Sequence, residues 1–521
     1  MNRREMLQLA AGAACSSYAA SLIAEPSMKP ASGTAEQWDV YEVVLQGPGN
    51  GNPFIDVTLS AKFSMGHRVV DVNGFYDGDG TYRIRFMPDT VGHWTWTTTS
   101  NTPALSGHTG GFDCTAAMAE NHGPVNTAHQ FHFQHADGTP YFPFGTTCYS
   151  CAFMGAPFEE QTMQTLSTAG FNKVRLCLLP KPQGHELTLL PFPRSTTDEN
   201  DLTRLNPAYF QHWEKTILRL RSMGIEADVI LFHPYDGWGY KAMPPEANDL
   251  YLRYAIARLA AYRNVWWSVA NEYDLVKTKT MKDWDHYFHV IQQDDPYSHL
   301  RSIHHSRVQY DNSKPWVTHA SLQEYDFTKS AEYRQAWGKP ILWDEIQYEG
   351  NISRRWGNLS PEEMTRRFWL AVVSGTYATH GETYMSPPGT PVWSDGGKLM
   401  GTSAPRIAYL HSLLEKITKT GINEFEGSYY LSAGQPSELY LYYFDMHSVG
   451  EYDFPLPAGI DFKCTLIDPW NMTSKELPGV FSGKAAKRNA ANTDPEEKPS
   501  AAQSHITLSG KPYMAALFQK V

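Results

Sequence analysis

Two apolar stretches of the sequence end on adjacent polar side chains that could do chemistry. VWWSVA is followed by Asn271 and Glu272, and PILW is followed by Asp344 and Glu345. A buried carboxylate is unfavourable unless it is paired or hydrogen-bonded. Each of these two dipeptides therefore either lies at a functional surface or simply ends an ordinary strand. If Glu272 and Glu345 meet at one site, one carboxyl group can protonate a glycosidic oxygen while the other attacks the anomeric carbon or activates water. The two stretches together therefore predict glycosidic bond cleavage.

The elements that would bring these carboxylates together form a repeating pattern over residues 135–420. Eight short apolar runs alternate there with amphipathic segments, and the runs are YFPFGTT, KVRLCLL, EADVILFHP, VWWSVANE, LRSIHH, PWVTHASLQ, PILWDE and THGETY. This pattern predicts a (β/α)8 TIM barrel, in which active-site residues lie at the carboxyl ends of the strands. A doubly wound open sheet is the alternative, but no Gly-rich phosphate loop follows the first run.

Three of the intervening segments carry helix signals. Asn206 and Pro207 are suited to the N-cap and first helical position of a helix that ends near Gly224. Ser360-Pro361-Glu362-Glu363 has the form of a capping box with Pro in the first turn. Residues 248–262 are amphipathic with a helical period.

The barrel is predicted to lie between two β-sandwich domains. Residues 38–118 and 421–521 contain short stretches of alternating apolar and polar side chains, separated by Gly, Asp and Pro turns. The chain of 521 residues is 41% hydrophobic and 19% charged, which is a globular composition. Its net charge of −11 argues against nucleic acid or an anionic membrane as a partner.

The N-terminus predicts export. In residues 1–24 the pair Arg3-Arg4 precedes a mildly apolar, Ala-rich run, as in a twin-arginine signal peptide, and the run is too short for an ordinary membrane span. A chance Arg pair before a frayed helix is the alternative. Residues 25–37 indicate a linker, and the mature protein is expected to be periplasmic or secreted. The five cysteines beyond this segment are an odd and sparse set, so packing thiols are expected in spite of the CxxC spacing of Cys148 and Cys151.

An Asn-Glu pair closing the fourth run and a Glu closing the seventh resemble the signature of glycoside hydrolase clan A. More narrowly, the segment from Phe142-Pro-Phe-Gly145 to Asp344-Glu345-Ile-Gln-Tyr-Glu349-Gly350 is similar to the apiosidase-like barrel family, and the flanking Ig-like and C-terminal β-sandwich domains fit the same architecture. The resemblance implies a retaining mechanism with Glu272 as acid/base and Glu345 as nucleophile. It also implies that Asn271 contacts the sugar 2-hydroxyl. Members of the apiosidase group proper tend to carry Asp at the position of Glu272.

Other residues near the ends of the runs are candidates for substrate contacts. Arg175 in the second run could hold Glu345 ionised or form a structural ion pair, and clan members often have an Arg there. Glu324 and Glu382 are rival carboxylates. The further candidates are His233, Trp238, His304, His305, Tyr325 and Trp393.

These further candidates also have structural alternatives. The loop that carries Trp238 either contacts sugar or holds a buried anchor, and Trp393 either stacks on a sugar ring or covers the barrel. The resemblance implies that a tyrosine in the region of Tyr325 hydrogen-bonds the nucleophile. A lone His is more often a core residue than a ligand, but His304 and His305 are adjacent at the rim. No third ligand at metal spacing is evident near them, so no metal or other cofactor is predicted.

The leading hypothesis is an exported retaining glycoside hydrolase acting on a plant, algal or microbial oligosaccharide or polysaccharide. Long loops after the strands suggest a pocket and thus exo action. Carboxyl groups about 5–5.5 Å apart would give retention and a gap of about 6.5–9.5 Å would give inversion. Mutual repulsion is expected to raise the pKa of one carboxyl group, as a general acid requires. A non-catalytic carbohydrate-binding protein and a structural surface protein are the alternatives.

Overall fold

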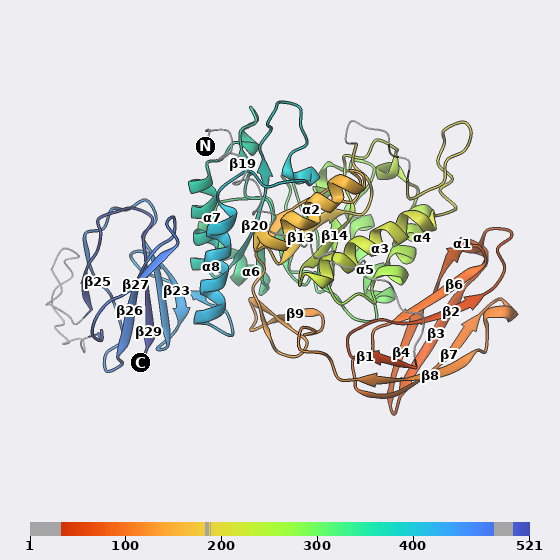
Figure 1. Ribbon diagram of the computed structural model, residues 1–521, viewed down its shortest axis with the longest axis horizontal. Coiled ribbons are helices and arrows are strands. Elements are labelled where there is room, and N and C mark those ends of the chain that lie inside the picture. Colours follow the sequence, from red (N-terminus) through yellow and green to blue (C-terminus); the bar gives the residue numbers. More distant parts are fainter. Residues whose placement is uncertain (1–32, 183–186, 188, 484–503) are drawn as a thin grey trace, which may run out of the picture.

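A computed structural model describes residues 33–182, 187, 189–483 and 504–521, and it confirms the predicted fold class. A central barrel lies between an N-terminal and a C-terminal β domain (Figure 1). The predicted signal peptide lies outside the described residues. Within the part of the chain that is described, no helix is both long and apolar enough to cross a membrane.

The barrel contains eight parallel strands that correspond to the eight predicted runs. They are β12 (Gly145–Thr147), β13 (Lys173–Cys177), β14 (Glu226–Phe232), β15 (Val265–Ala270), β16 (Arg301–Ser302), β17 (Ala320–Leu322), β18 (Ile341–Trp343) and β20 (Tyr377–His380). The hydrogen-bonded order is β16-β15-β14-β13-β12-β20-β18-β17, and a parallel bridge between His304 and Ser321 joins the two ends. Because the strands are buried on both faces, they are apolar runs rather than alternating ones.

In the described part of the barrel there are seven α-helices. Figure 1 shows these helices around the strands. They are α2 (Ala156–Ala169), α3 (Pro207–Ser222), α4 (Pro245–Leu259), α5 (Met281–Asp294), α6 (Ser330–Trp337), α7 (Pro361–Val373) and α8 (Ala404–Ile417). The predicted caps are present, because Asn206 accepts from Ala208 N and Ser360 accepts from Glu363 N. Residues 303–319, all of them described, form no α-helix between β16 and β17.

The N-terminal domain is a sandwich of two antiparallel-rich sheets. Its strands are β1 (Thr34–Glu36), β2 (Tyr41–Gln46), β3 (Leu59–Met65), β4 (Arg68–Asn73), β5 (Phe75–Gly78), β6 (Thr81–Phe86), β7 (Gly92–Ser100) and β8 (Thr109–Thr115), with the short helix α1 (Pro53–Asp56). One sheet has the order β1-β8-β7-β3-β4 and the other β2-β6-β5. A small sheet of β9 (Val125–Ala128), β10 (His132–His135) and β11 (Pro140–Tyr141) leads into the barrel.

A buried charge network joins the N-terminal sandwich to the barrel. Arg85 of β6 donates to Glu214 of α3 at 2.7 Å and to Glu42 of β2 at 2.8 Å. Arg258 of α4 donates to the same Glu214 oxygen at 2.6 Å and to Asp77 of β5 at 2.7 Å. Both arginines are buried, so each needs its carboxylate partners to offset the loss of water.

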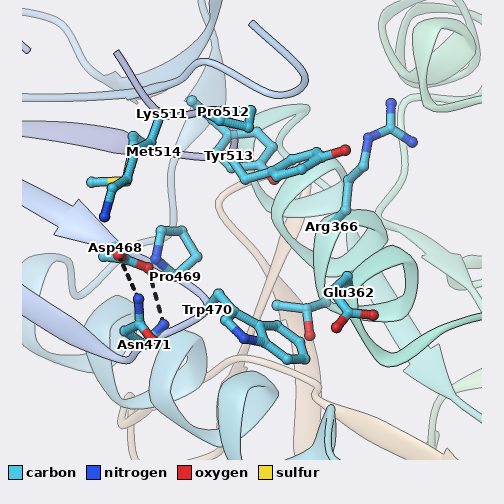
Figure 2. Close-up of a pocket in the computed structure, with 12 residues that line it drawn as sticks. Glu362, Arg366, Asp468, Pro469, Trp470, Asn471, Lys511, Pro512, Tyr513 and Met514 are labelled. Carbon is cyan, nitrogen blue, oxygen red and sulfur yellow. Dashed lines mark hydrogen bonds between the residues drawn. The ribbon is translucent and has the colours of Figure 1, made fainter. Parts of the chain in front are cut away.

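The C-terminal domain packs against helix α7 of the barrel. Its main sheet has the order β22-β23-β24-β29-β26-β27, and β25 pairs with β28. These strands are β22 (Asn423–Glu424), β23 (Leu431–Gln435), β24 (Leu439–Tyr443), β25 (Glu451–Asp453), β26 (Phe462–Asp468), β27 (Thr473–Glu476), β28 (His505–Thr507) and β29 (Ala515–Lys520). Trp369 stacks on Tyr443 across the junction, and a hollow of about 290 Å³ beside it is lined in part by Arg366, Trp470 and Tyr513 (Figure 2).

The cysteines of the described residues are free and buried, so the predicted packing thiols are confirmed. They are Cys114, Cys148, Cys151, Cys177 and Cys464.

Candidate active site

Glu345 lies at the carboxyl end of β18 and is held by three side chains from other strands. Its Oε1 accepts a hydrogen bond from the Tyr149 hydroxyl at 2.5 Å. Nε2 of His304 lies 3.4 Å from the same oxygen, and Nη1 of Arg175 lies 3.7 Å from it. Burial alone would raise the pKa of this carboxyl group, but His304, Arg175 and Tyr149 outweigh that effect and lower the pKa of Glu345 to about 2. Glu345 is therefore ionised at neutral pH and fixed in position.

Glu272 lies two residues after the end of β15 and has the opposite electrostatic environment. Its backbone φ is +46°, a left-handed conformation that costs a non-glycine residue about 1–3 kcal/mol and is concentrated at functional sites. Its Oε2 is buried and makes no hydrogen bond with the described residues. Burial, together with the charge of Glu345, raises the pKa of Glu272 to about 7. Glu272 therefore keeps its proton up to neutral pH.

Arg175 connects Asn271 to the residues that surround Glu345. Arg175 donates to Asn271 Oδ1 at 3.1 Å and to the Tyr149 hydroxyl at 3.3 Å. Asn271 is thus oriented by a fully buried guanidinium, with its backbone N–H donating to Phe232 O at 2.9 Å. Arg175 combines the two roles considered from the sequence, because it lies beside Glu345 and also pairs with buried Asp228, 3.6 Å away.

Asp344, the other acidic residue that ends the seventh strand, points into the barrel interior. It accepts hydrogen bonds from Lys173 at 2.9 Å, Thr379 at 2.7 Å and Ser321 at 2.6 Å. Although burial alone would raise it, the pKa of Asp344 is held far below its usual range by Lys173 and Arg175. Because all its partners are structural, Asp344 is an anchor of the barrel core.

The two adjacent histidines differ in their contacts. Nδ1 of His304 lies 3.1 Å from Ser321 Oγ, and its Nε2 faces Glu345. Burial and the nearby charge of Arg175 lower the pKa of His304. His305 Nε2 lies 3.6 Å from Glu324, the rival carboxylate, whose pKa falls to about 2 because His305, Lys329 and other partners overcome the effect of burial. Glu324 therefore lacks the raised pKa of a general acid.

Several other predicted contacts have structural roles. Both ring nitrogens of His233 are used by the backbone, with Nε2 donating to Leu179 O at 2.9 Å and Nδ1 accepting from Tyr235 N at 3.1 Å. Trp238 is partly buried and lies parallel to Tyr240, with ring centroids 6.2 Å apart. Trp393 is buried and donates to Thr146 Oγ1 at 2.8 Å, so it covers the barrel and has no free face for a sugar.

Tyr325 and Glu382 also differ from expectation. Tyr325 is 40% exposed, and its ring packs beneath the Arg367 guanidinium at 4.4 Å. The tyrosine that donates to Glu345 is instead Tyr149, which follows the first strand. Glu382 is buried and accepts hydrogen bonds from the backbone N–H groups of Met400 and Gly401 in a neighbouring loop.

Sequence reasoning missed Tyr149 and its neighbour Tyr348, whose hydroxyl groups lie 3.1 Å apart. Tyr149 stands inside the CxxC stretch that follows the first strand, and position at a strand end was the one signal that could have identified it. Tyr348 lies three residues after the strand-seven Glu345 and carries no such signal.

A (β/α)8 barrel with an ionised and a protonated glutamate after its seventh and fourth strands has the equipment of a glycoside hydrolase. Comparison with known proteins agrees with this class. The apiosidase-like catalytic domain family matches residues 127–417, and two domains of unknown function match residues 34–101 (DUF5060) and 429–519 (DUF5605). The chain therefore belongs to the apiosidase-like family, and the protein is a glycoside hydrolase.

Solved structures extend this comparison. A putative glycoside hydrolase from Bacteroides vulgatus ATCC 8482 is 37% identical, covers 94% of this chain and 100% of its own, and superposes with a TM-score of 0.87. A glycoside hydrolase family 5 protein from the same organism shares 14% identity over 76% of this chain and 94% of its own, with a TM-score of 0.58, which shows the likeness of fold alone. No curated protein matches the chain.

Proposed function

We propose that the protein is an exported, retaining and exo-acting glycoside hydrolase of plant, algal or microbial glycans. The observation that carries this proposal is the difference in pKa, and hence in protonation state, between Glu272 and Glu345. Glu345 is ionised and hydrogen-bonded, while Glu272 has a pKa of about 7 and lies near enough for the charge of Glu345 to raise that value. An ionised nucleophile beside a protonated acid is the arrangement that double displacement requires.

In the first step, a carboxylate oxygen of Glu345 attacks the anomeric carbon. The bond from that carbon to the leaving oxygen breaks, and Glu272 transfers its proton to this oxygen. The hydrogen bond from Tyr149 and the nearby Arg175 keep the Glu345 carboxylate in place during the attack. Asn271, fixed by Arg175, is suited to contact the hydroxyl group next to the reacting carbon.

In the second step, water attacks the anomeric carbon of the glycosyl ester. Once Glu345 is esterified its negative charge is absent, so the interaction that raised the pKa of Glu272 is removed. Glu272 then accepts the proton of the water molecule, and Glu345 leaves as a carboxylate. The same residue thus acts as acid and then as base because its neighbour changes charge.

The further parts of the proposal have separate support. Export is supported by Arg3-Arg4 and the Ala-rich run that follows them. Exo action is supported by the long segments between the strands and the next helices, such as residues 233–244 between β14 and α4. Action on a glycan is also supported by the likeness to the putative glycoside hydrolase from Bacteroides vulgatus.

The test is hydrolysis of an array of aryl glycosides and plant, algal and microbial glycans by the purified protein, with Glu345→Gln as the blank. We expect sugar release by the wild type and a loss of about 10³-fold or more in the variant. Proton NMR of the first product reports the anomeric configuration, and inversion would contradict the retaining mechanism. Binding of a glycan without hydrolysis would favour a carbohydrate-binding protein instead.

A further inference from the structure

Three buried side chains near the rim of the barrel take no part in this mechanism. Glu349 belongs to β19 (Glu349–Gly350), and Glu382 lies opposite it on β21 (Glu382–Thr383). His380 ends β20, two residues before Glu382. One nitrogen or oxygen atom from each residue lies within 4.8 Å of the other two. The exposed fractions are 0% for Glu349, 0% for His380 and 1% for Glu382, so all three are removed from solvent.

His380 directs an unused ring nitrogen at the two carboxylates. Its Nδ1 lies 3.1 Å from Thr146 Oγ1, which fixes the plane of the ring. Its Nε2 is buried and makes no hydrogen bond with any described residue, and Oε2 of Glu349 lies 3.9 Å from it. In the tautomer in which Nδ1 carries the ring proton and donates to Thr146 Oγ1, Nε2 presents a lone pair to the two carboxyl groups. This arrangement is unfavourable for an empty site and suited to a cation.

The carboxylates are oriented by the backbone of the next loop. Glu382 accepts from Met400 N at 2.6 Å and from Gly401 N at 2.9 Å, and Glu349 accepts from Thr402 N at 2.9 Å. Each oxygen of Glu382 accepts one of these hydrogen bonds and retains a further lone pair for a ligand bond. Glu349 also accepts from the Ser403 hydroxyl through Oε2 and from the Tyr384 hydroxyl through Oε1 at 3.4 Å. Hydrogen-bonded carboxylates and a histidine whose other nitrogen is also hydrogen-bonded are the usual outer contacts of a metal site.

No lysine or arginine among the described residues forms an ion pair with either carboxylate. When both are ionised, two buried carboxylates side by side carry two negative charges, and one imidazole can carry at most one positive charge. One divalent cation would neutralise both. A nitrogen and carboxylate oxygens match the ligands that zinc takes, with distances of about 2.0–2.2 Å.

We propose that Glu349, His380 and Glu382 bind one divalent cation of the zinc type. The ion joins β20, the β19–β21 pair and the loop that enters α8. Because Tyr348 directly precedes Glu349 and its hydroxyl lies 3.1 Å from that of Tyr149, the ion stabilises the segment next to the Glu345 site. It has a structural role and takes no part in bond cleavage.

The test uses the full-length protein, dialysed against EDTA and then titrated with ZnCl₂ by calorimetry, with MnCl₂ and CaCl₂ in parallel. We expect saturable binding of one equivalent of zinc and a rise in Tm of about 5 °C at a hundredfold excess over Kd. His380→Gln is expected to remove both effects. His286→Gln is the matched control, because His286 is half exposed on α5 and pairs only with Asp249.

Other outcomes decide against the site. If no cation binds and Tm does not change, the three residues are a hydrogen-bonded anchor for residues 400–403. Unchanged binding by folded His380→Gln would place the ion elsewhere. If His380→Gln does not fold, X-ray absorption of the zinc-loaded wild type still tests the site, since nitrogen and oxygen ligands are expected and sulfur ligands would overturn the proposal.

Discussion

At the scale of single residues, the protonated Glu272 is the group whose removal has the most diagnostic effect. In Glu272→Ala, substrates with poor leaving groups are expected to lose about 10²–10⁴-fold in kcat, because no proton reaches the leaving oxygen. Substrates that carry a dinitrophenyl leaving group need little protonation and are expected to form the glycosyl ester normally. Added azide then replaces water and gives a glycosyl azide of retained configuration, detectable by NMR. Equal losses for both kinds of leaving group would argue against the acid role.

The pH dependence follows from the same two carboxyl groups. Glu345 acts when ionised, and Glu272 acts first when protonated, with pKa values of about 2 and about 7. For substrates with poor leaving groups, kcat/KM is therefore expected to fall about tenfold per pH unit above pH 7. The decline is caused by loss of the Glu272 proton, so it is expected to be absent in Glu272→Ala assayed with an activated substrate. A wild-type plateau extending to pH 9 would contradict the assignment.

Sequence reasoning identified both of these glutamates because each one is the second residue after an apolar run. It could not specify their roles from the residues alone. The low pKa of Glu345 comes from His304, Arg175 and Tyr149, which lie on or just after three other strands, and the raised pKa of Glu272 comes from its burial and from Glu345. Nor could it predict the cluster of Glu349, His380 and Glu382. Those ligands have no regular spacing and meet only when β19 pairs with β21.

At the scale of elements, all eight strands were predictable because parallel strands buried on both faces are short apolar runs. The absence of an α-helix from residues 303–319 could not be predicted. Between β16 and β17 the barrel closes through the His304–Ser321 bridge, which the sequence pattern does not reveal. Tyr149 shows a similar limit. It reaches Glu345 only because β12 lies next to β20 and β20 next to β18 in the closed sheet.

The contact between the segment after β12 and Glu345 gives a test at this scale. Tyr149→Phe removes a hydrogen bond to a charged group, a change of about 1.5–3 kcal/mol, so kcat/KM is expected to fall about 10- to 100-fold. This hydrogen bond lowers the pKa of Glu345, so the acidic limb of the pH profile is expected to move to higher pH. Tyr251→Phe is the control, because Tyr251 donates to Leu231 O away from the carboxylates. An acidic limb that does not move would leave Tyr149 a structural role only.

At the scale of the whole molecule, the network around Glu214 ties the N-terminal sandwich to the barrel. In Glu214→Gln, Arg85 and Arg258 lose the carboxylate that they share and remain buried. Removing one partner of a buried pair costs about 3–5 kcal/mol of the free energy of unfolding, which differential scanning calorimetry would record as a lower Tm. Glu160→Gln is the control, because Glu160 pairs with Arg219 at a half-exposed site, where about 0–1 kcal/mol is expected.

The sign of the pH effect distinguishes this network from simple loss of packing. Burial alone would raise the pKa of Glu214, but Arg85 and Arg258 outweigh it, so the folded-state pKa lies below the ordinary 4.5. The stabilisation is thus fully present above pH 4.5 and is lost as the pH falls through the lowered folded-state value. The difference in Tm between wild type and Glu214→Gln is expected to be largest near neutral pH and to shrink in acid. A constant difference across that range would mean that the carboxylate stabilises the junction by its shape and hydrogen bonds rather than by its charge.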